Sequence, residues 1–176
     1  MTVLIIEGPD LSGKSYAIEK IGKAYKTGFI LKNLYKPTKA RDGNIYACYW
    51  NIINKVLDQP FVILDRFYPS QAVYSYLRGE DEMESGEIFA IEKFLLDQKL
   101  NKFIIVYLNT DLKTLKKRYI QRGDEHIDIS DLRKISERYE IFYNLTKLPV
   151  ICVDTMEDGW LIELKKAVSR LENEYR

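Results

Sequence analysis

Residues that build metal centres and disulfide frameworks are scarce in this sequence of 176 residues. Its two cysteines, Cys48 and Cys152, are too few for a disulfide scaffold and lack the spacing of a metal site. The one histidine, His126, argues against a metal site built on histidines. Disulfide-stapled and zinc-stabilised small folds are therefore excluded, and Cys152, inside an apolar run, is expected to be a buried strand thiol.

Long hydrophobic runs and a strong charge of one sign are missing as well. No apolar run approaches the ~18 residues of a membrane helix, and no charged region precedes the first apolar stretch as in a signal peptide. The net charge of +1 provides no large basic surface for a long nucleic acid. We therefore expect a cytoplasmic protein whose partners include neither a membrane nor a long nucleic acid.

What the sequence does contain is a complete phosphate-binding loop. Residues 8 to 15 read GPDLSGKS and match G-x-x-x-x-G-K-S, between an apolar strand pattern and a helical pattern. Glycines let successive backbone N–H groups converge on an anion, and the helix N-terminus adds partial positive charge. Lys14 would reach the outer phosphates and the Ser15 hydroxyl would bind Mg²⁺, whereas a chance glycine turn would not carry all four fixed positions in this context. The expected nucleotide-binding residues are Gly8, Asp10, Leu11, Ser12, Gly13, Lys14 and Ser15.

Apolar runs alternate with helical patterns along the whole chain. Strands are expected at residues 3–6, 61–64, 103–108 and 150–153, with a weaker one at 28–31. Helices are expected at residues 14–25, 45–57, 68–77, 85–98, 112–122, 130–145 and 159–175. This alternation, in a chain with 46% hydrophobic residues and no linker, predicts one α/β domain over residues 1 to 176. With the phosphate-binding loop, we expect a three-layer P-loop NTPase-type fold: a five-stranded parallel sheet, helices on both faces and a small lid at about residues 118–130.

Ligands of an open parallel sheet lie beyond the carboxyl ends of its strands. Asp65 and Arg66 follow the strand expected at 61–64. Asp65 would hold Mg²⁺ or orient an acceptor, and Arg66 would bind a phosphate or a partner carboxylate. The alternative is an Asp-Arg pair that only ends the strand and caps the next helix.

Asp10 is a costly residue to place beside a triphosphate, because like charges repel. That cost suggests a use, such as accepting a hydrogen bond from a sugar hydroxyl; the alternative is a loop carboxylate turned to solvent. Glu7 is either a buried structural carboxylate or an outer-shell Mg²⁺ group.

A basic run crosses the helix expected at 112–122 and comprises Lys113, Lys116, Lys117, Arg118 and Arg122. Arg118 and Arg122 are four residues apart and share a helix face. Arginines on a lid would stabilise the charge that spreads over a moving phosphoryl group. The lysines are better explained as a solvated basic face.

Aromatic residues are frequent, with 13 tyrosines, and several lie near the Asp65–Arg66 strand end. Tyr46, Tyr49, Phe67 and Tyr74 would line a pocket for an acceptor base. Core packing is the alternative for each of these rings.

The motifs resemble those of the thymidylate kinase family of P-loop kinases and, more loosely, the deoxynucleoside kinases. Residues 7 to 15 match the family's Glu-Gly-x-Asp-x-x-Gly-Lys-Ser/Thr, and residues 65 to 74 match Asp-Arg-Tyr/Phe-x-x-Ser-x-x-Ala-Tyr with Val73 in place of alanine. The family's proline loop has a counterpart at residues 35–37. A third family motif, Tyr-Leu-Asp followed by a helix and an arginine-bearing lid, corresponds to Tyr-Leu-Asn at residues 107–109 and the helix after it. The resemblance covers nearly the whole chain.

The resemblance implies ATP and Mg²⁺ as cofactors and phosphoryl transfer to a deoxynucleoside monophosphate, with dTMP to dTDP as the leading expectation. It implies catalytic roles for Lys14, Arg66, Arg118 and Arg122, and metal binding by Ser15 and Asp65. The implied substrate-binding residues are Asp10, Pro37, Arg41, Tyr46, Tyr49, Arg66, Ser70 and Tyr74. Dimers are common in the family, and residues 85–100 are apolar enough to form one.

One departure from the family leaves the acceptor open. Thymidylate kinases usually carry an arginine in the helix before the Asp-Arg strand, but residues 45–59 contain only Lys55 as a cation. Arg41 or Lys39 would have to replace it; otherwise the acceptor is an uncharged deoxynucleoside, and Glu7 or Asp65 serves as the base. A kinase acting on a polynucleotide end or another hydroxyl, and a non-catalytic nucleotide-binding module, are the remaining alternatives.

Overall fold

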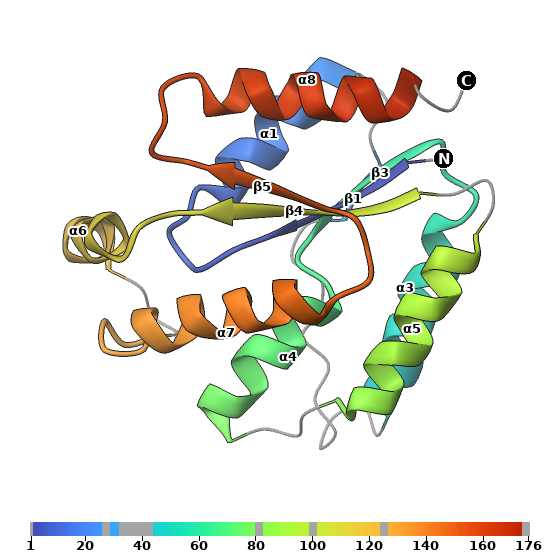
Figure 1. The fold of residues 1–176 in the computed structure, drawn as a ribbon, viewed down its shortest axis with the longest axis horizontal. Coiled ribbons are helices and arrows are strands. Elements are labelled where there is room, and N and C mark those ends of the chain that lie inside the picture. Colours follow the sequence, from blue (N-terminus) through green and yellow to red (C-terminus); the bar gives the residue numbers. More distant parts are fainter. Residues whose placement is uncertain are drawn as a thin grey trace.

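A parallel sheet runs through the middle of the molecule with helices on both faces (Figure 1). The structure is a computed structural model that describes residues 2–25, 29–31, 44–79, 83–98, 102–123 and 127–173. The strand order is β2-β3-β1-β4-β5, and every neighbouring pair is parallel. The body of the sheet is formed by β1 (Thr2–Glu7), β3 (Phe61–Asp65), β4 (Lys102–Asn109) and β5 (Val150–Asp154). The weaker strand expected at 28–31 corresponds to β2 (Phe29–Leu31), a three-residue strand at one edge.

Helices cover the two faces unequally (Figure 1). On one face lie α1 (Lys14–Tyr25) and α8 (Trp160–Asn173). The other face carries α3 (Ile45–Val56), α4 (Tyr68–Arg78), α5 (Ser85–Asp97) and α7 (Leu132–Leu145). The remaining helix, α6 (Leu112–Arg122), stands at the end of the sheet toward which the strands point. This end is where an open α/β sheet binds its ligands.

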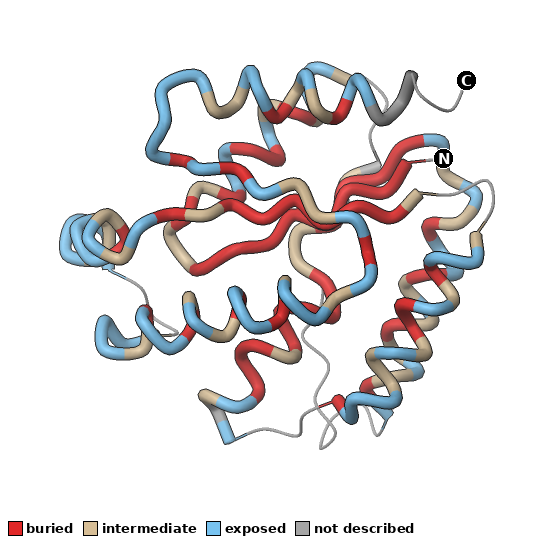
Figure 2. The backbone as a smooth tube through the Cα atoms, in the orientation of Figure 1, coloured by how far each residue is buried: buried red, intermediate tan, exposed pale blue. Residues whose placement is uncertain are grey.

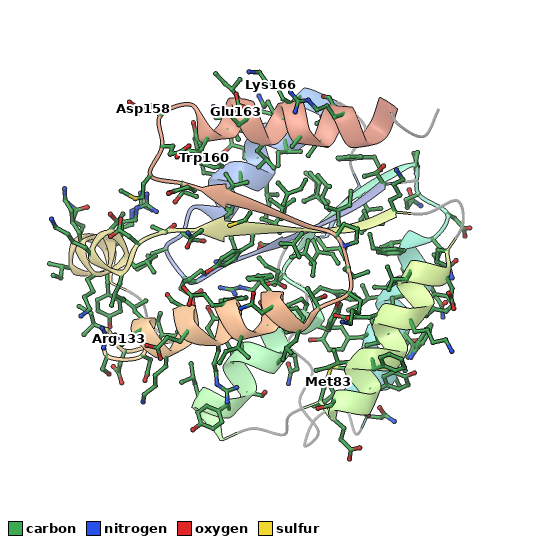
Figure 3. All side chains as sticks on the ribbon, in the orientation of Figure 1. Met83, Arg133, Asp158, Trp160, Glu163 and Lys166 are labelled. Atoms are coloured by element: carbon green, nitrogen blue, oxygen red, sulfur yellow. The ribbon has the colours of Figure 1, made fainter. Side chains whose placement is uncertain are left out.

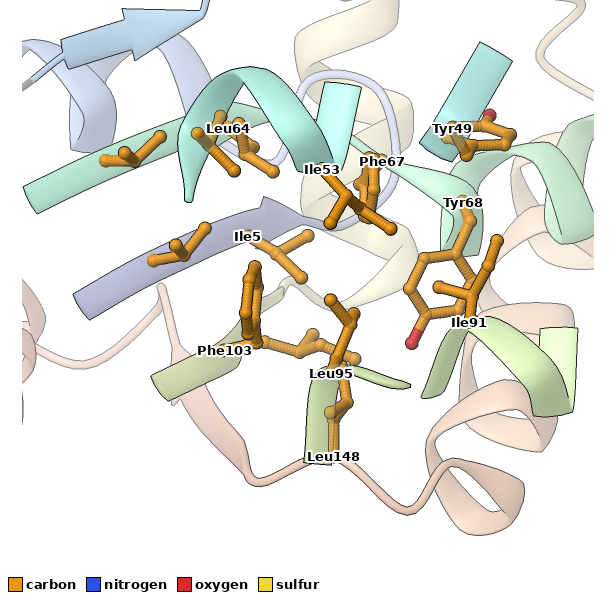
Figure 4. Close-up of a cluster of buried hydrophobic side chains, with 14 of the residues drawn as sticks. Ile5, Tyr49, Ile53, Leu64, Phe67, Tyr68, Ile91, Leu95, Phe103 and Leu148 are labelled. Atoms are coloured by element: carbon orange, nitrogen blue, oxygen red, sulfur yellow. The ribbon is translucent and has the colours of Figure 1, made fainter. Parts of the chain in front are cut away.

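The alternation of side chains along each strand builds hydrophobic cores on both faces of the sheet. Val3 and Ile5 of β1 point toward the core that α3 and α5 cover, whereas Leu4 and Ile6 pack with α1 and α8. The strands β1, β3 and β4 are buried along most of their length, as the red segments of Figure 2 show. Figure 4 shows two rings that enter the first core after β3: Phe67, just before α4, lies near Ile53 of α3, and Tyr68, the first residue of α4, lies beside Ile91 of α5. The connection that carries Asp65 and Arg66 is therefore anchored on its far side by core packing.

One expectation about burial is wrong. The run at 150–153 was expected to be a buried strand with Cys152 as a buried thiol, but β5 lies at the sheet edge and Cys152 is exposed. An edge strand has a neighbour on one side only, here β4, so an apolar composition does not bury all of its residues. Among the described helices, none combines the length and apolarity needed to cross a bilayer.

Candidate functional site

The phosphate-binding loop connects β1 to α1, and its backbone requires unusual conformations. Gly8 and Gly13 have φ of 145° and 99°, and Leu11 adopts a φ of 67°. A Cβ on Gly8 would lie 2.7 Å from the carbonyl oxygen of Leu108 on β4, so only glycine fits there. Leu11 holds a left-handed conformation without being glycine, which is the kind of backbone strain found at functional sites.

Lys14 lies at the start of α1 and turns back onto the loop that precedes it. Its Nζ donates hydrogen bonds to the carbonyl oxygens of Gly8, at 3.0 Å, and Pro9, at 2.6 Å. Burial lowers the pKa of Lys14 to about 7, and the positive charge of Arg66 acts in the same direction. Carboxylates of Asp10, Glu7 and Asp65 oppose the shift without cancelling it. The ammonium group is therefore poised for an anionic ligand that would favour its charged form.

Ser15 and Asp65 are the residues expected to hold magnesium. Ser15 is exposed in the first turn of α1, and Asp65 is the half-buried last residue of β3, paired in register with Ile6 of β1. The described residues include no group of three or more His, Cys, Asp or Glu side chains suited to a metal ion. Mg²⁺ keeps several waters and binds largely through substrate phosphates, so a hydroxyl and a carboxylate are protein ligands of a kind and number that suit the ion.

Arg66 connects the end of β3 to the phosphate-binding loop. Its φ is 69°, and its Nη2 forms an ion pair with Asp10. Nη1 donates to the Gly8 carbonyl oxygen at 3.4 Å, to Ser70 Oγ at 3.0 Å and to the Tyr139 hydroxyl at 2.9 Å. We call Asp10, Arg66, Ser70, Tyr74 and Tyr139 the Arg66 cluster.

Asp10 is fixed from two sides within this cluster. One carboxylate oxygen accepts from Arg66, and the other accepts from the Tyr74 hydroxyl at 2.7 Å. The guanidinium carbon of Arg66 also lies 4.8 Å from the centre of the Tyr74 ring, within the range of a cation–π contact. The loop carboxylate is thus turned toward the end of β3 rather than outward into solvent.

A second part of the site lies between the loop, α6 and the start of α8. Arg118 Nη1 donates to the Leu11 carbonyl oxygen at 2.8 Å. A cavity of about 290 Å³ opens here, and we call it the donor cavity; its lining residues are Leu11, Ser12, Gly13, Tyr16, Arg118, Arg122, Thr155 and Trp160. Trp160 begins α8 next to the end of β5 (Figure 3), and its ring lies 6.1 Å from that of Tyr16.

Other residues expected at the site lie elsewhere or outside the described part of the chain. Tyr49 is buried in the hydrophobic core, edge-on to Phe67, and Tyr46 packs edge-on against Trp50. Core packing, the alternative raised for these rings, is what their contacts show. Pro37 and Arg41 fall outside the described residues, as do residues 124–126 of the expected lid.

The Arg66 cluster contains one residue that the sequence did not single out, Tyr139, and it contacts Glu7, for which a structural and a metal-related role were both left open. Glu7 is fully buried at the end of β1, and Tyr139, fully buried on α7, contacts both Glu7 and Arg66. Burial raises the pKa of the Glu7 carboxyl, while the charge of Arg66 and three donated hydrogen bonds oppose the shift. The only sequence signal for Tyr139 is its place on the apolar stripe of α7 with Ile135 and Phe142, which reads as core.

The donor cavity is also lined by Thr155, which the motifs did not indicate and which contacts Thr110 behind it. Thr155 follows β5, and its Oγ1 lies 2.6 Å from Thr110 Oγ1, which follows β4. Both hydroxyls lie beyond strand ends, where polar residues signal a ligand site, but neither belongs to a recognised motif.

A relative from a prophage matches most of the chain. The chain is 32% identical to the SPβ prophage-derived protein YorR of Bacillus subtilis over 139 residues, which cover 79% of this chain and 80% of YorR. The crystal structure of YorR in complex with phosphorylated GDP has a TM-score of 0.78 to this structure at 29% identity, covering 98% of this chain and 96% of that one. No family model matches the sequence.

More distant kinases share the fold. Deoxyadenosine kinase from M. mycoides has a TM-score of 0.62 at 19% identity, covering 97% of this chain and 100% of that one. Polyphosphate kinase 2 from Arthrobacter aurescens has a TM-score of 0.71 at 18% identity, covering 93% of this chain and 64% of that one. The fold is thus that of P-loop kinases, and the chain belongs to the family of YorR.

Proposed function

We propose that this protein is a nucleotide kinase that transfers the γ-phosphoryl group of magnesium-bound ATP to a deoxynucleoside monophosphate, with dTMP as the first acceptor to test. The observation that carries this proposal is the convergence of three cations on one loop. Lys14, Arg66 and Arg118, from α1, the end of β3 and α6, each donate to carbonyl oxygens of residues 8–11. Cations that meet around a glycine-rich loop at a helix N-terminus suit a polyphosphate chain.

The donor nucleotide would lie along the loop with its base in the donor cavity. Tyr16 and Trp160 supply aromatic surface there, and Arg118 and Arg122 supply positive charge. Arginines beside the transferred group would stabilise the charge that develops on its oxygens. Because YorR was solved in complex with phosphorylated GDP, GTP deserves a test as donor beside ATP.

The chain's own residues would divide the work of transfer. Ser15 and Asp65 would hold Mg²⁺, which shields the charge of the donor phosphates. Lys14 would bind the outer phosphates of the donor, and Asp10 would accept a hydrogen bond from a hydroxyl of the acceptor sugar. With the acceptor oxygen already a phosphate, positioning and charge stabilisation would supply most of the rate.

A specific observation favours a second candidate, a deoxynucleoside kinase. Both Nη atoms of Arg66 are engaged by groups of the chain itself, and α3 carries Lys55 in place of an arginine. Within the described residues, few cationic groups therefore remain to bind an acceptor phosphate. An uncharged acceptor would then need a general base; Glu7, fully buried with three donors, is unsuited to that role, which leaves Asp65.

The test is an assay of phosphoryl transfer with Mg²⁺, using ATP or GTP as donor and the deoxynucleosides and their 5′-monophosphates as acceptors. Turnover with a monophosphate supports the first candidate, and turnover with nucleosides alone supports the second. Lys14→Ala is the inactive control, and Lys23→Ala, which changes an exposed lysine of the same helix, is its matched active control. If no acceptor in the panel is phosphorylated with either donor, both candidates are refuted.

A further inference from the structure

The carboxylate of Glu7 is the centre of a buried hydrogen-bond network behind the phosphate-binding loop. Glu7 Oε1 accepts from the backbone N–H of Phe67 at 2.7 Å. Oε2 accepts from Ser70 Oγ at 2.7 Å and from the Tyr139 hydroxyl at 3.0 Å. These donors come from the β3–α4 connection, α4 and α7, so one carboxylate joins three segments to the end of β1.

Counting hydrogens assigns a direction to each bond. Nη1 of Arg66 carries two hydrogens, and its two shorter contacts are Ser70 Oγ and the Tyr139 hydroxyl. Each hydroxyl has a single hydrogen. The two hydroxyl oxygens also lie 3.0 Å apart, and either could donate to the other. We assign both hydrogens to Glu7 Oε2, because a charged carboxylate is the stronger acceptor. Both hydroxyls therefore accept from the guanidinium and donate to the carboxylate, as two parallel bridges between a cation and an anion that do not touch directly.

This arrangement fixes the rotation of the guanidinium. With Nη1 held by two bridges, the guanidinium plane is set and Nη2 is aimed at Asp10 of the loop. The backbone of Arg66 has a left-handed φ of 69°, which residues other than glycine adopt at an energetic cost. The orientation of this residue therefore depends on the contacts that its side chain makes. We propose that Tyr139 is a positioning residue whose hydroxyl, together with that of Ser70, holds Arg66 in the orientation that pairs with Asp10.

Packing of the Tyr139 ring does not account for its hydroxyl. The ring stacks on Tyr143 with centroids 5.8 Å apart, and it also contacts Tyr74 and Tyr107. A phenylalanine would make the same ring contacts without burying a polar group, which is costly unless the group is hydrogen-bonded. The hydroxyl contributes the two bonds of the bridge, one accepted and one donated.

Tyr143 provides a matched control on the same helix. It lies one turn further along α7, stacks on the same ring, and has a buried hydroxyl without a hydrogen-bond partner among the described residues. Tyr139→Phe and Tyr143→Phe remove the same atom from neighbouring positions. Only the first change removes a bridge to Arg66.

The proposal rests on the proposed kinase function for its catalytic consequence, so the experiment has two readouts. The first is ¹⁵N NMR of the Arg66 guanidinium, assigned with Arg66→Lys. We expect separate Nη signals in the wild type and Tyr143→Phe, and signals averaged by rotation in Tyr139→Phe. The second is steady-state kinetics, where Tyr139→Phe lowers kcat about 10- to 100-fold with the donor KM within about twofold, while Tyr143→Phe retains wild-type kcat.

Melting temperatures separate positioning from unfolding, and Ser70→Ala removes the other bridge if Tyr139→Phe fails to fold. Averaged Arg66 signals in the bridge variants alone would support the proposal. Identical Arg66 signals and kcat in Tyr139→Phe and Tyr143→Phe would overturn it. A wild type that transfers no phosphate would refute the kinase function, and the Arg66 signals would still decide the positioning role.

Discussion

The two sides of the site are built differently. On the acceptor side, the Arg66 cluster is cross-linked by hydrogen bonds from four segments, and the side chains of Arg66 and Asp10 are only 16% and 24% exposed. On the donor side, Arg118 reaches the loop through one hydrogen bond to Leu11, and Arg122 is exposed at the end of α6. For the proposed kinase, this difference predicts an acceptor side that is organised before substrate binds and a donor side whose arginines complete their contacts on the nucleotide.

Lys14 lies where the two sides meet, and its removal is expected to have the largest effect. We expect Lys14→Ala to lower kcat about 10³-fold or more, because the variant loses the cation that we propose binds the transferred phosphates. The melting temperature should change little, since the lost hydrogen bonds are offset by removal of a buried charge. Kinetics and thermal melts of Lys14→Ala and the control Lys23→Ala check this; near-normal turnover would contradict the loop's role.

Arg122 tests the donor side alone. We expect Arg122→Ala to reduce kcat about 10²-fold with little change in the acceptor KM, because charge stabilisation in the transition state is lost while the Arg66 cluster stays intact. Lys116→Ala, on the same helix but outside the donor cavity, is the matched control. A change confined to KM would show that Arg122 serves binding rather than catalysis.

Asp10 tests the acceptor side and should have a smaller effect. Asp10→Asn keeps the size of the side chain but removes the charge that pairs with Arg66. We expect kcat/KM for the acceptor to fall about 10- to 100-fold, as for a lost charge-assisted hydrogen bond, with donor affinity within about twofold. Calorimetry of donor binding separates an effect on the acceptor from an effect on the donor. A loss of donor affinity larger than the loss of acceptor kcat/KM would place Asp10 at the metal.

The contrast between the two sides is also a contrast in what the sequence reveals. The phosphate-binding loop and the Asp65–Arg66 pair were predictable because each is a contiguous run whose chemistry depends on its immediate neighbours. Tyr139 was not predictable because its hydrogen bond to Arg66 spans 73 residues of sequence and requires the packing of α7 against α4. Distant contacts of this kind leave no local pattern beyond an apolar helix stripe.

The strands show the same limit. The apolar runs of β1 and β5 look alike in the sequence, yet β1 is buried along its whole length and β5 is half open. What separates them is the strand order, which places β1 between two strands and β5 at an edge. Strand order is set by how the whole chain packs, so the exposure of Cys152 could not be inferred from its neighbours.

The protonation state of Lys14 is expected to give the smallest measurable effect, and it tests the phosphate-binding loop specifically. The folded chain holds the pKa of Lys14 at about 7, whereas a lysine in an unfolded chain titrates near ~10.4. Between these values the unfolded chain binds more protons, so this group makes the free protein more stable as the pH rises through that interval. The phosphates of a bound nucleotide favour the charged ammonium and reverse the shift.

Nucleotide binding is therefore expected to take up a proton. At pH 8 to 9, where the free protein has lost the Lys14 proton, binding of magnesium-bound ATP should take up as much as about one proton per site. Calorimetry in two buffers of different ionisation enthalpy measures this uptake, and Lys14→Ala, which has no ammonium to recharge, is the control. Equal apparent enthalpies in the two buffers would mean that Lys14 stays charged in the free protein, and that burial beside Arg66 does not set its protonation.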